Sequence, residues 1–242
     1  MSTLRGQPSG FGIDITALTK RVLGALIALY ILELLLVFWF KVDVTRWVFM
    51  NRLGPSWMPW QFLTAQLFNH LSPMGALFDW LMIVFFFGPV ERLMGRKKLL
   101  TSLGIVAIGA GILATALDAL GAVAGEGPFV GLNPIITALV VFFGLTLPNA
   151  TIRLFFVLPI KAAWIAWGSG LIALLYFLAA RDLDSAMAIS GWVLAFGVMK
   201  IGPDEWRKLW LRWKARKLEK ELEKFEVIDG GKGSGDDDEY IH

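Results

Sequence analysis

The stretch from Val22 to Phe40 is apolar at every position except Glu33, and its length constrains the fold more than any other feature of the chain. A bilayer core of about 30 Å is crossed by roughly 20 consecutive apolar residues in a helix. Similar stretches follow at 75–90, 99–117, 129–147, 162–180 and 185–201. The hydrophobic share of the chain, 56%, also exceeds that of soluble domains. The sequence therefore predicts an all-α, polytopic membrane protein with six spans.

Basic residues beside the spans indicate the orientation, because Lys and Arg concentrate in cytoplasmic loops. Lys20 and Arg21 precede the first span, four basic residues lie between Arg92 and Lys98, and a basic stretch follows Lys200. Three basic residues in the loop after the first span fall on the opposite side, namely Lys41, Arg46 and Arg52. The balance predicts that both termini are cytoplasmic, and we interpret the membrane as a bacterial inner membrane.

Changes in composition divide the chain into four parts. We expect a cytoplasmic tail at 1–18, a six-span domain at 19–202, a cytosolic amphipathic helix at 203–228 and an acidic, disordered tail at 229–242. The cytosolic helix carries candidate partner-binding residues on two faces, namely Trp206, Trp210 and Trp213, then Leu218, Leu222 and Phe225. Its basic first half is typical of a helix on anionic lipid. A solvated helix without a partner remains the alternative.

Two connecting segments and one acidic residue differ in composition from the apolar spans. Residues 41–71 mix aromatic, charged and proline residues, which predicts a partly immersed interfacial loop with short helices. Residues 153–161 are predicted as a short interfacial turn. Glu33 lies in the middle of the first span, where an ionisable group marks either a hydrogen-bonded packing position or a proton or substrate relay.

The segment from Gly127 to Leu139 places a glycine-bearing loop directly before an apolar helix. It resembles the nucleophile loop of rhomboid intramembrane serine proteases, whose fourth helix opens with a Gly-x-Ser-Gly motif. Two further segments are similar to rhomboid motifs: Gly88-Pro89-Val90-Glu91-Arg92-Leu93-Met94-Gly95, and Trp60-Gln61-Phe62-Leu63-Thr64. The resemblance covers about 60–197 and implies a rhomboid-like six-helix bundle.

The same resemblance implies that the catalytic groups are missing. It places Asn133 at the serine nucleophile, Ala188 at the histidine base, and Gly75 and Asp79 at the side-chain oxyanion donors. A serine hydroxyl needs an adjacent base, and the sixth span contains no histidine. We therefore expect a pseudoprotease without enzymatic activity, which binds transmembrane clients or partner proteins as an adaptor or chaperone.

Two other functions stay open. One is a structural subunit of a larger membrane complex. The other is an active intramembrane protease with displaced catalytic residues, drawn from Glu33, His70, Asp79 and Ser190. The chain has no Cys and only two His, so we expect no metal site and no cofactor. The expected partners are membrane lipids and membrane proteins, and no nucleic acid, because membrane topology accounts for the basic charge.

Overall fold

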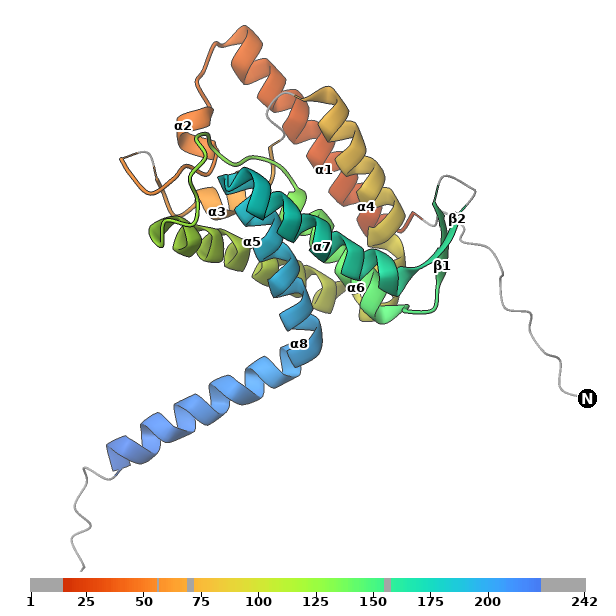
Figure 1. The fold of residues 1–242 in the computed structure, drawn as a ribbon, viewed down its shortest axis with the longest axis vertical. Helices are drawn as coiled ribbons and strands as arrows, with labels where there is room; N and C mark the ends of the chain where they lie inside the picture. Colours follow the sequence, from red (N-terminus) through yellow and green to blue (C-terminus); the bar gives the residue numbers. More distant parts are fainter. Residues whose placement is uncertain (1–14, 56, 69–71, 155–157, 223–242) are drawn as a thin grey trace, which may run out of the picture. The chain divides into compact units, whose positions relative to one another are not determined.

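The computed structural model describes residues 15–55, 57–68, 72–154 and 158–222 (Figure 1). Helices dominate these residues. They are α1 Ala17–Leu34, continued by the π-helical η1 Leu35–Trp39, then α2 Thr45–Val48, α3 Gln61–Thr64, α4 Pro73–Met94, α5 Arg96–Ala119, α6 Asn133–Thr146, α7 Ala162–Ala180 and α8 Leu183–Leu222. Two short strands, β1 Thr151–Leu154 and β2 Leu158–Lys161, complete the order.

Five helices in the described residues are long and apolar enough to cross a bilayer. They cover Ala17–Trp39, Pro73–Met94, Arg96–Ala119, Ala162–Ala180 and Leu183–Lys200. Each lies within a few residues of a span predicted from hydrophobic length. The prediction of an all-α polytopic membrane protein is confirmed.

The remaining predicted span corresponds to α6, which is the central helix of the bundle. Its 14 residues extend about 21 Å at 1.5 Å per residue, less than a bilayer core of about 30 Å. Every residue from Ala138 to Gly144 is buried. Figure 1 shows α6 among the longer helices, and it packs directly against α4, α5 and α7. A short helix is stable at this place because protein surrounds its middle.

The first loop contains the two short helices α2 and α3, as expected, and it is fixed to the bundle by hydrogen bonds. Arg52 forms an ion pair with the buried carboxylate of Asp118 at the end of α5, at 2.8 Å. Met50 and Phe129 exchange two backbone hydrogen bonds of 3.0 and 2.8 Å. The Nε2 of Gln66 donates to the backbone oxygen of Ala107, at 2.7 Å. These contacts fix the loop to α5 and to the segment before α6.

One sequence-based assignment needs correction. Thr151–Leu154 and Leu158–Lys161 form two antiparallel strands, in which Thr151 pairs with Lys161 and Leu154 with Leu158, where a short interfacial turn was expected. Backbone pairing satisfies the polar groups of this connection without a helix. The helix assignment of α8 runs through Pro203, where a separate cytosolic helix was expected to begin, since a Pro removes only one helical N–H donor. That domain boundary stays a prediction.

The described chain divides into two compact units after Pro203. The first unit holds α1 to α7 and the spanning part of α8, and the second holds the rest of α8. Each candidate site described below lies in the first unit.

We predict that both ends of the chain lie on the cytosolic face. The side chains of Lys20, Arg21, Arg96 and Lys97 are exposed at the ends of α1 and α5 that this orientation places in the cytosol. Epitope tags at either terminus should be digested by protease added to the cytosolic side of sealed vesicles. A tag placed between 120 and 126 should be protected. Protection of a terminal tag would contradict the orientation.

Candidate functional site

Four polar side chains gather at the start of α6, and we call Asp79, Asn133, Tyr176 and Asp184 the polar cluster. The Asn133 Nδ2 donates to Asp184 Oδ1 at 2.9 Å. The Tyr176 hydroxyl donates to Asp184 Oδ2 at 3.3 Å. The carboxylate of Asp79 lies near the backbone N–H of Leu132 and near the carboxylate of Asp184. The cluster thus joins side chains from α4, α6, α7 and α8.

Local structure fixes the α8 member of the cluster. The Asp182 Oδ1 accepts the backbone N–H of Ser185 at 2.8 Å, which is the usual cap of a helix start. Arg181 has a positive φ of 50°, and its guanidinium donates to the carbonyls of Gly121 and Ala122. The turn between α7 and α8 is therefore attached to the loop before α6. Asp184 is held in the first turn of α8 as a result.

The start of α6 is positioned by glycines and by close helix contact. Gly127 and Gly131 have φ values of +113° and +127°, which other residues rarely adopt. The Gly131 N–H donates to the carbonyl of Ala65 at 2.9 Å. A Cβ added to Gly191 of α8 would lie 2.7 Å from the Cα of Pro134. Only glycine at position 191 lets α8 come this near to the start of α6.

Burial differs across the cluster. Asp79 is 8% exposed and Tyr176 is 43% exposed. Asn133 is exposed, and Asp184 is partly buried. An amide has two N–H donors and a carbonyl acceptor, so Asn133 keeps hydrogen-bonding capacity beyond its bond to Asp184. The accessible part of the cluster is the Asn133 amide and the Tyr176 phenol.

Asp79 and Ser190, two residues considered for displaced catalysis, are both buried. The carboxylate of Asp79 lies near that of Asp184. Ser190 is fully buried in α8, and its hydroxyl has no hydrogen-bond partner among the described residues. No group of three or more possible metal ligands occurs in the described part of the chain.

The structure brings together only some of the residues singled out from the sequence. Asn133 and Asp79 belong to the cluster. The α8 residue that contacts Asn133 is Asp184, one turn before Ala188. Gly75 donates its N–H to Ser72 at the start of α4. Glu33 is fully buried in α1, immediately before the π-helical turn of η1.

The remaining candidates lie elsewhere. Trp213 and Leu218 are exposed on α8, at 63% and 50%. His70 and Phe225 fall outside the described residues, as do the side chains of Trp206, Trp210 and Leu222. Asp184 and Tyr176 were missed by sequence reasoning. The available signals were an acid directly before a predicted span and a phenol within an apolar one.

Comparison with known protein families identifies the family of the chain. Residues 20–199 match the model of the family described as "Eukaryotic integral membrane protein (DUF1751)". The chain belongs to this family. The match includes all four residues of the polar cluster. No protein with a curated description matches the chain.

This finding corrects two expectations. The assignment to the rhomboid family is wrong, because the matching family model is that of the eukaryotic membrane family. The glycine spacings that suggested it have local causes here: Gly131 and Gly95 occupy positive-φ turns, and Gly191 allows a close helix contact. The bacterial inner membrane is also wrong, because the family is eukaryotic, while the integral membrane location stands.

Proposed function

We propose that this protein is a non-catalytic membrane protein that binds transmembrane helices of partner proteins at the polar cluster. The observation that carries the proposal is the exposed Asn133 amide, held by Asp184 beside the exposed Tyr176 phenol. Polar side chains between membrane helices form hydrogen bonds across the interface, worth about 0.6–2 kcal/mol each. An amide with spare donors and acceptors fits such a contact.

The surroundings of the cluster suit a helix as the partner. α6 packs against both α4 and α7. The outward side chains of these two helices are large and apolar, including Leu77 and Phe78 of α4 and Ile172 and Leu175 of α7. Ile172 lies one turn before Tyr176 on the same face of α7. A partner helix along α7 would therefore contact apolar side chains first and the polar cluster at its end.

The absence of enzymatic activity is part of the proposal. The exposed group at the start of α6 is the Asn133 amide, and an amide does not form an acyl intermediate. The hydrogen bonds of Asp184 go to Asn133 and Tyr176, so this carboxylate orients two neighbours. A role in holding partners requires only that these groups stay in place.

The test is photocrosslinking in intact membranes. A photoreactive residue at Ile172 should form an adduct with a membrane protein, and the same residue at Ile112, an exposed position on α5, should not. Asn133→Leu should weaken formation of the Ile172 adduct about threefold to thirtyfold, since it removes interhelical hydrogen bonds. Thr101→Leu, at an exposed polar position of α5, is the matched control and should leave the adduct unchanged.

Two results would contradict the proposal. The adduct at Ile172 could persist at full yield in Asn133→Leu, in which case the cluster makes no contact with the partner. Both probe positions could instead give the same adducts in equal yield, which is the pattern of random lateral collisions. A partner recovered in fixed one-to-one amount would favour the structural subunit over an adaptor with changing clients.

A further inference from the structure

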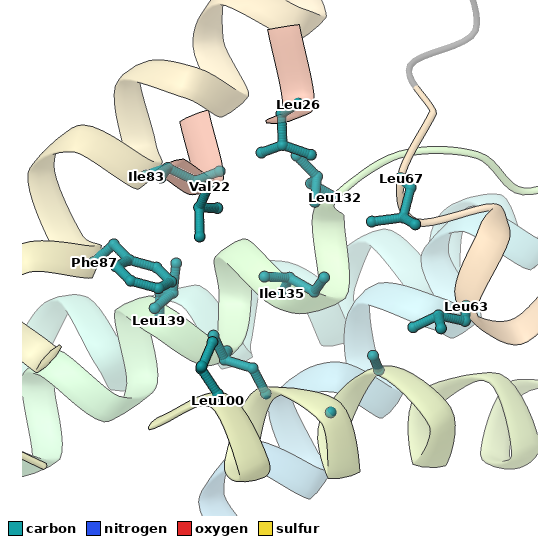
Figure 2. Close-up of a pocket in the computed structure, with 13 residues that line it drawn as sticks. Val22, Leu26, Leu63, Leu67, Ile83, Phe87, Leu100, Leu132, Ile135 and Leu139 are labelled. Carbon is teal, nitrogen blue, oxygen red and sulfur yellow. The ribbon is translucent and has the colours of Figure 1, made fainter. Parts of the chain in front are cut away.

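An apolar cavity of about 180 Å³ lies in the first unit, and none of the four residues of the polar cluster lines it. Figure 2 shows side chains from α1, α4, α5, α6 and the first loop around one space, with Val22 and Leu26 on α1 and Ile83 and Phe87 on α4. Every residue that lines it is apolar or glycine. An apolar cavity of about 150 Å³ stays free of water and takes small hydrocarbons. The occupant that fits is hydrocarbon without polar groups.

The cavity follows the axis of α5. Its α5 lining consists of Leu100, Leu103, Gly104 and Ala107, one stripe with the spacing i, i+3, i+4 and i+7. Seven residues of helix extend about 10 Å. An occupant that contacts the whole stripe is extended along the helix, as an alkyl chain is.

The cavity reaches the surface of the protein. Leu63 and Leu100 line it and are nevertheless 47% and 42% exposed. The surface of a spanning helix is in contact with lipid chains, which are as apolar as a Leu side chain. A lipid acyl chain therefore moves from the bilayer into the cavity at no cost in transfer free energy. It also makes the dispersion contacts that an empty cavity lacks.

Basic side chains stand at one end of this stripe. Arg96 and Lys97 lie four and three residues before Leu100, so they continue the α5 stripe beyond the cavity. Arg21 precedes the cavity residue Val22 on α1. All three are exposed, and none forms an ion pair within the described residues. The carboxylate of Glu91 accepts a hydrogen bond from Thr16.

We propose that the cavity binds one acyl chain of an anionic phospholipid, whose phosphate lies against Arg96 and Lys97. The apolar lining selects a hydrocarbon chain, and the basic end selects a negatively charged headgroup. Basic residues between transmembrane helices bind anionic headgroups in this way. The site is separate from the proposed partner-binding surface and does not depend on it.

The test uses the full chain in a mild detergent, titrated with dioleoyl phosphatidylserine or dioleoyl phosphatidylcholine, with bound lipid counted by native mass spectrometry. We expect one saturable site that prefers phosphatidylserine. Arg96→Gln combined with Lys97→Gln should weaken phosphatidylserine binding about 25-fold, at about fivefold for each charge, with phosphatidylcholine binding unchanged. Lys98→Gln is the matched control, because Lys98 lies on the other side of α5 and should change neither lipid.

Two further variants test the binding of the acyl chain in the cavity. Gly104→Leu fills the cavity, and a Cβ at this position meets no atom within 4 Å, so the fold should tolerate it. Leu100→Trp narrows the entrance at a position that is already exposed. Both should reduce lipid binding to nonspecific attachment while the melting temperature is kept.

The acyl-chain site and the headgroup site are each contradicted by a different result. Unchanged lipid binding in Gly104→Leu and Leu100→Trp would overturn the acyl-chain site. Loss of a copurified protein in the same variants would show that a side chain of that protein occupies the cavity instead of a lipid. An equal loss of phosphatidylserine binding in Lys98→Gln and in the double variant would overturn the headgroup assignment.

Discussion

Gly144→Ala should lower the apparent melting temperature by about 4–12 °C, because α6 and α7 meet at this residue without room for a methyl group. An added Cβ would lie 2.4 Å from the Cβ of Ala166 and 2.6 Å from the carbonyl oxygen of Ala162. Both neighbours belong to the rigid backbone region of α7, so the helices must separate. Overpacking of this kind costs about 2–3 kcal/mol, which gives that temperature range for a chain of this size.

Gly168→Ala provides the matched control on α7. A Cβ at Gly168 meets no atom within 4 Å. Alanine favours a helix over glycine by about 1 kcal/mol, so this variant should melt at or above the temperature of the unmodified protein. Both should be measured in the same detergent at one scan rate, since unfolding of such proteins is often irreversible. Equal melting temperatures for the two variants would contradict the close contact of α6 with α7.

Most of the fold was predicted from the lengths of the apolar stretches. The fifth span was predicted at 162–180 and found as Ala162–Ala180, since a span of this length leaves little freedom in a bilayer. The hairpin at 151–161 could not be predicted in the same way. Its strands have four residues each, too few for an alternating pattern to be distinguished from chance.

The boundary of the membrane domain rests on composition alone. Hydropathy falls after Lys200, and Pro203 follows, so the sequence predicts that a separate helix begins there, and this boundary stays a prediction. Composition indicates whether a helix suits the membrane, whereas a helix itself needs only backbone hydrogen bonds. A Pro removes one of them, so the helix assignment of α8 includes Pro203 and continues to Leu222.

The candidate site was partly predictable for a related reason. Asn133 and Asp79 were singled out as positions where a family motif was not kept, and the structure gives them a shared location. Their partners were not predictable, because Asp184 is 51 residues from Asn133 in the sequence. Contacts at that separation depend on how α6, α7 and α8 pack, and helical periodicity carries no information on this packing.

Gln61→Leu should release the first loop and destabilise the protein by about 3 kcal/mol. The sequence suggested Gln61 only as part of a segment similar to a protease motif, but the fully buried side chain has a local role in the structure. Its Oε1 accepts the N–H groups of Asn51 and Met58 at 3.3 and 3.1 Å. Its Nε2 donates to the carbonyl of Arg46 at 3.0 Å. Leucine would leave these three backbone groups without partners, at about 1 kcal/mol or more for each.

The loss should be visible as faster proteolysis between residues 41 and 60 and as a lower melting temperature. Trp60→Phe is the control, because the Trp60 Nε1 bond to the carbonyl of Trp47 is exposed and water replaces it. This variant should be digested at the rate of the unmodified protein. If Gln61→Leu resists the protease equally well, the ion pair of Arg52 with Asp118 and the pairing of Met50 with Phe129 hold the loop without it. The start of α6 would then depend on those contacts, since Phe129 lies four residues before Asn133.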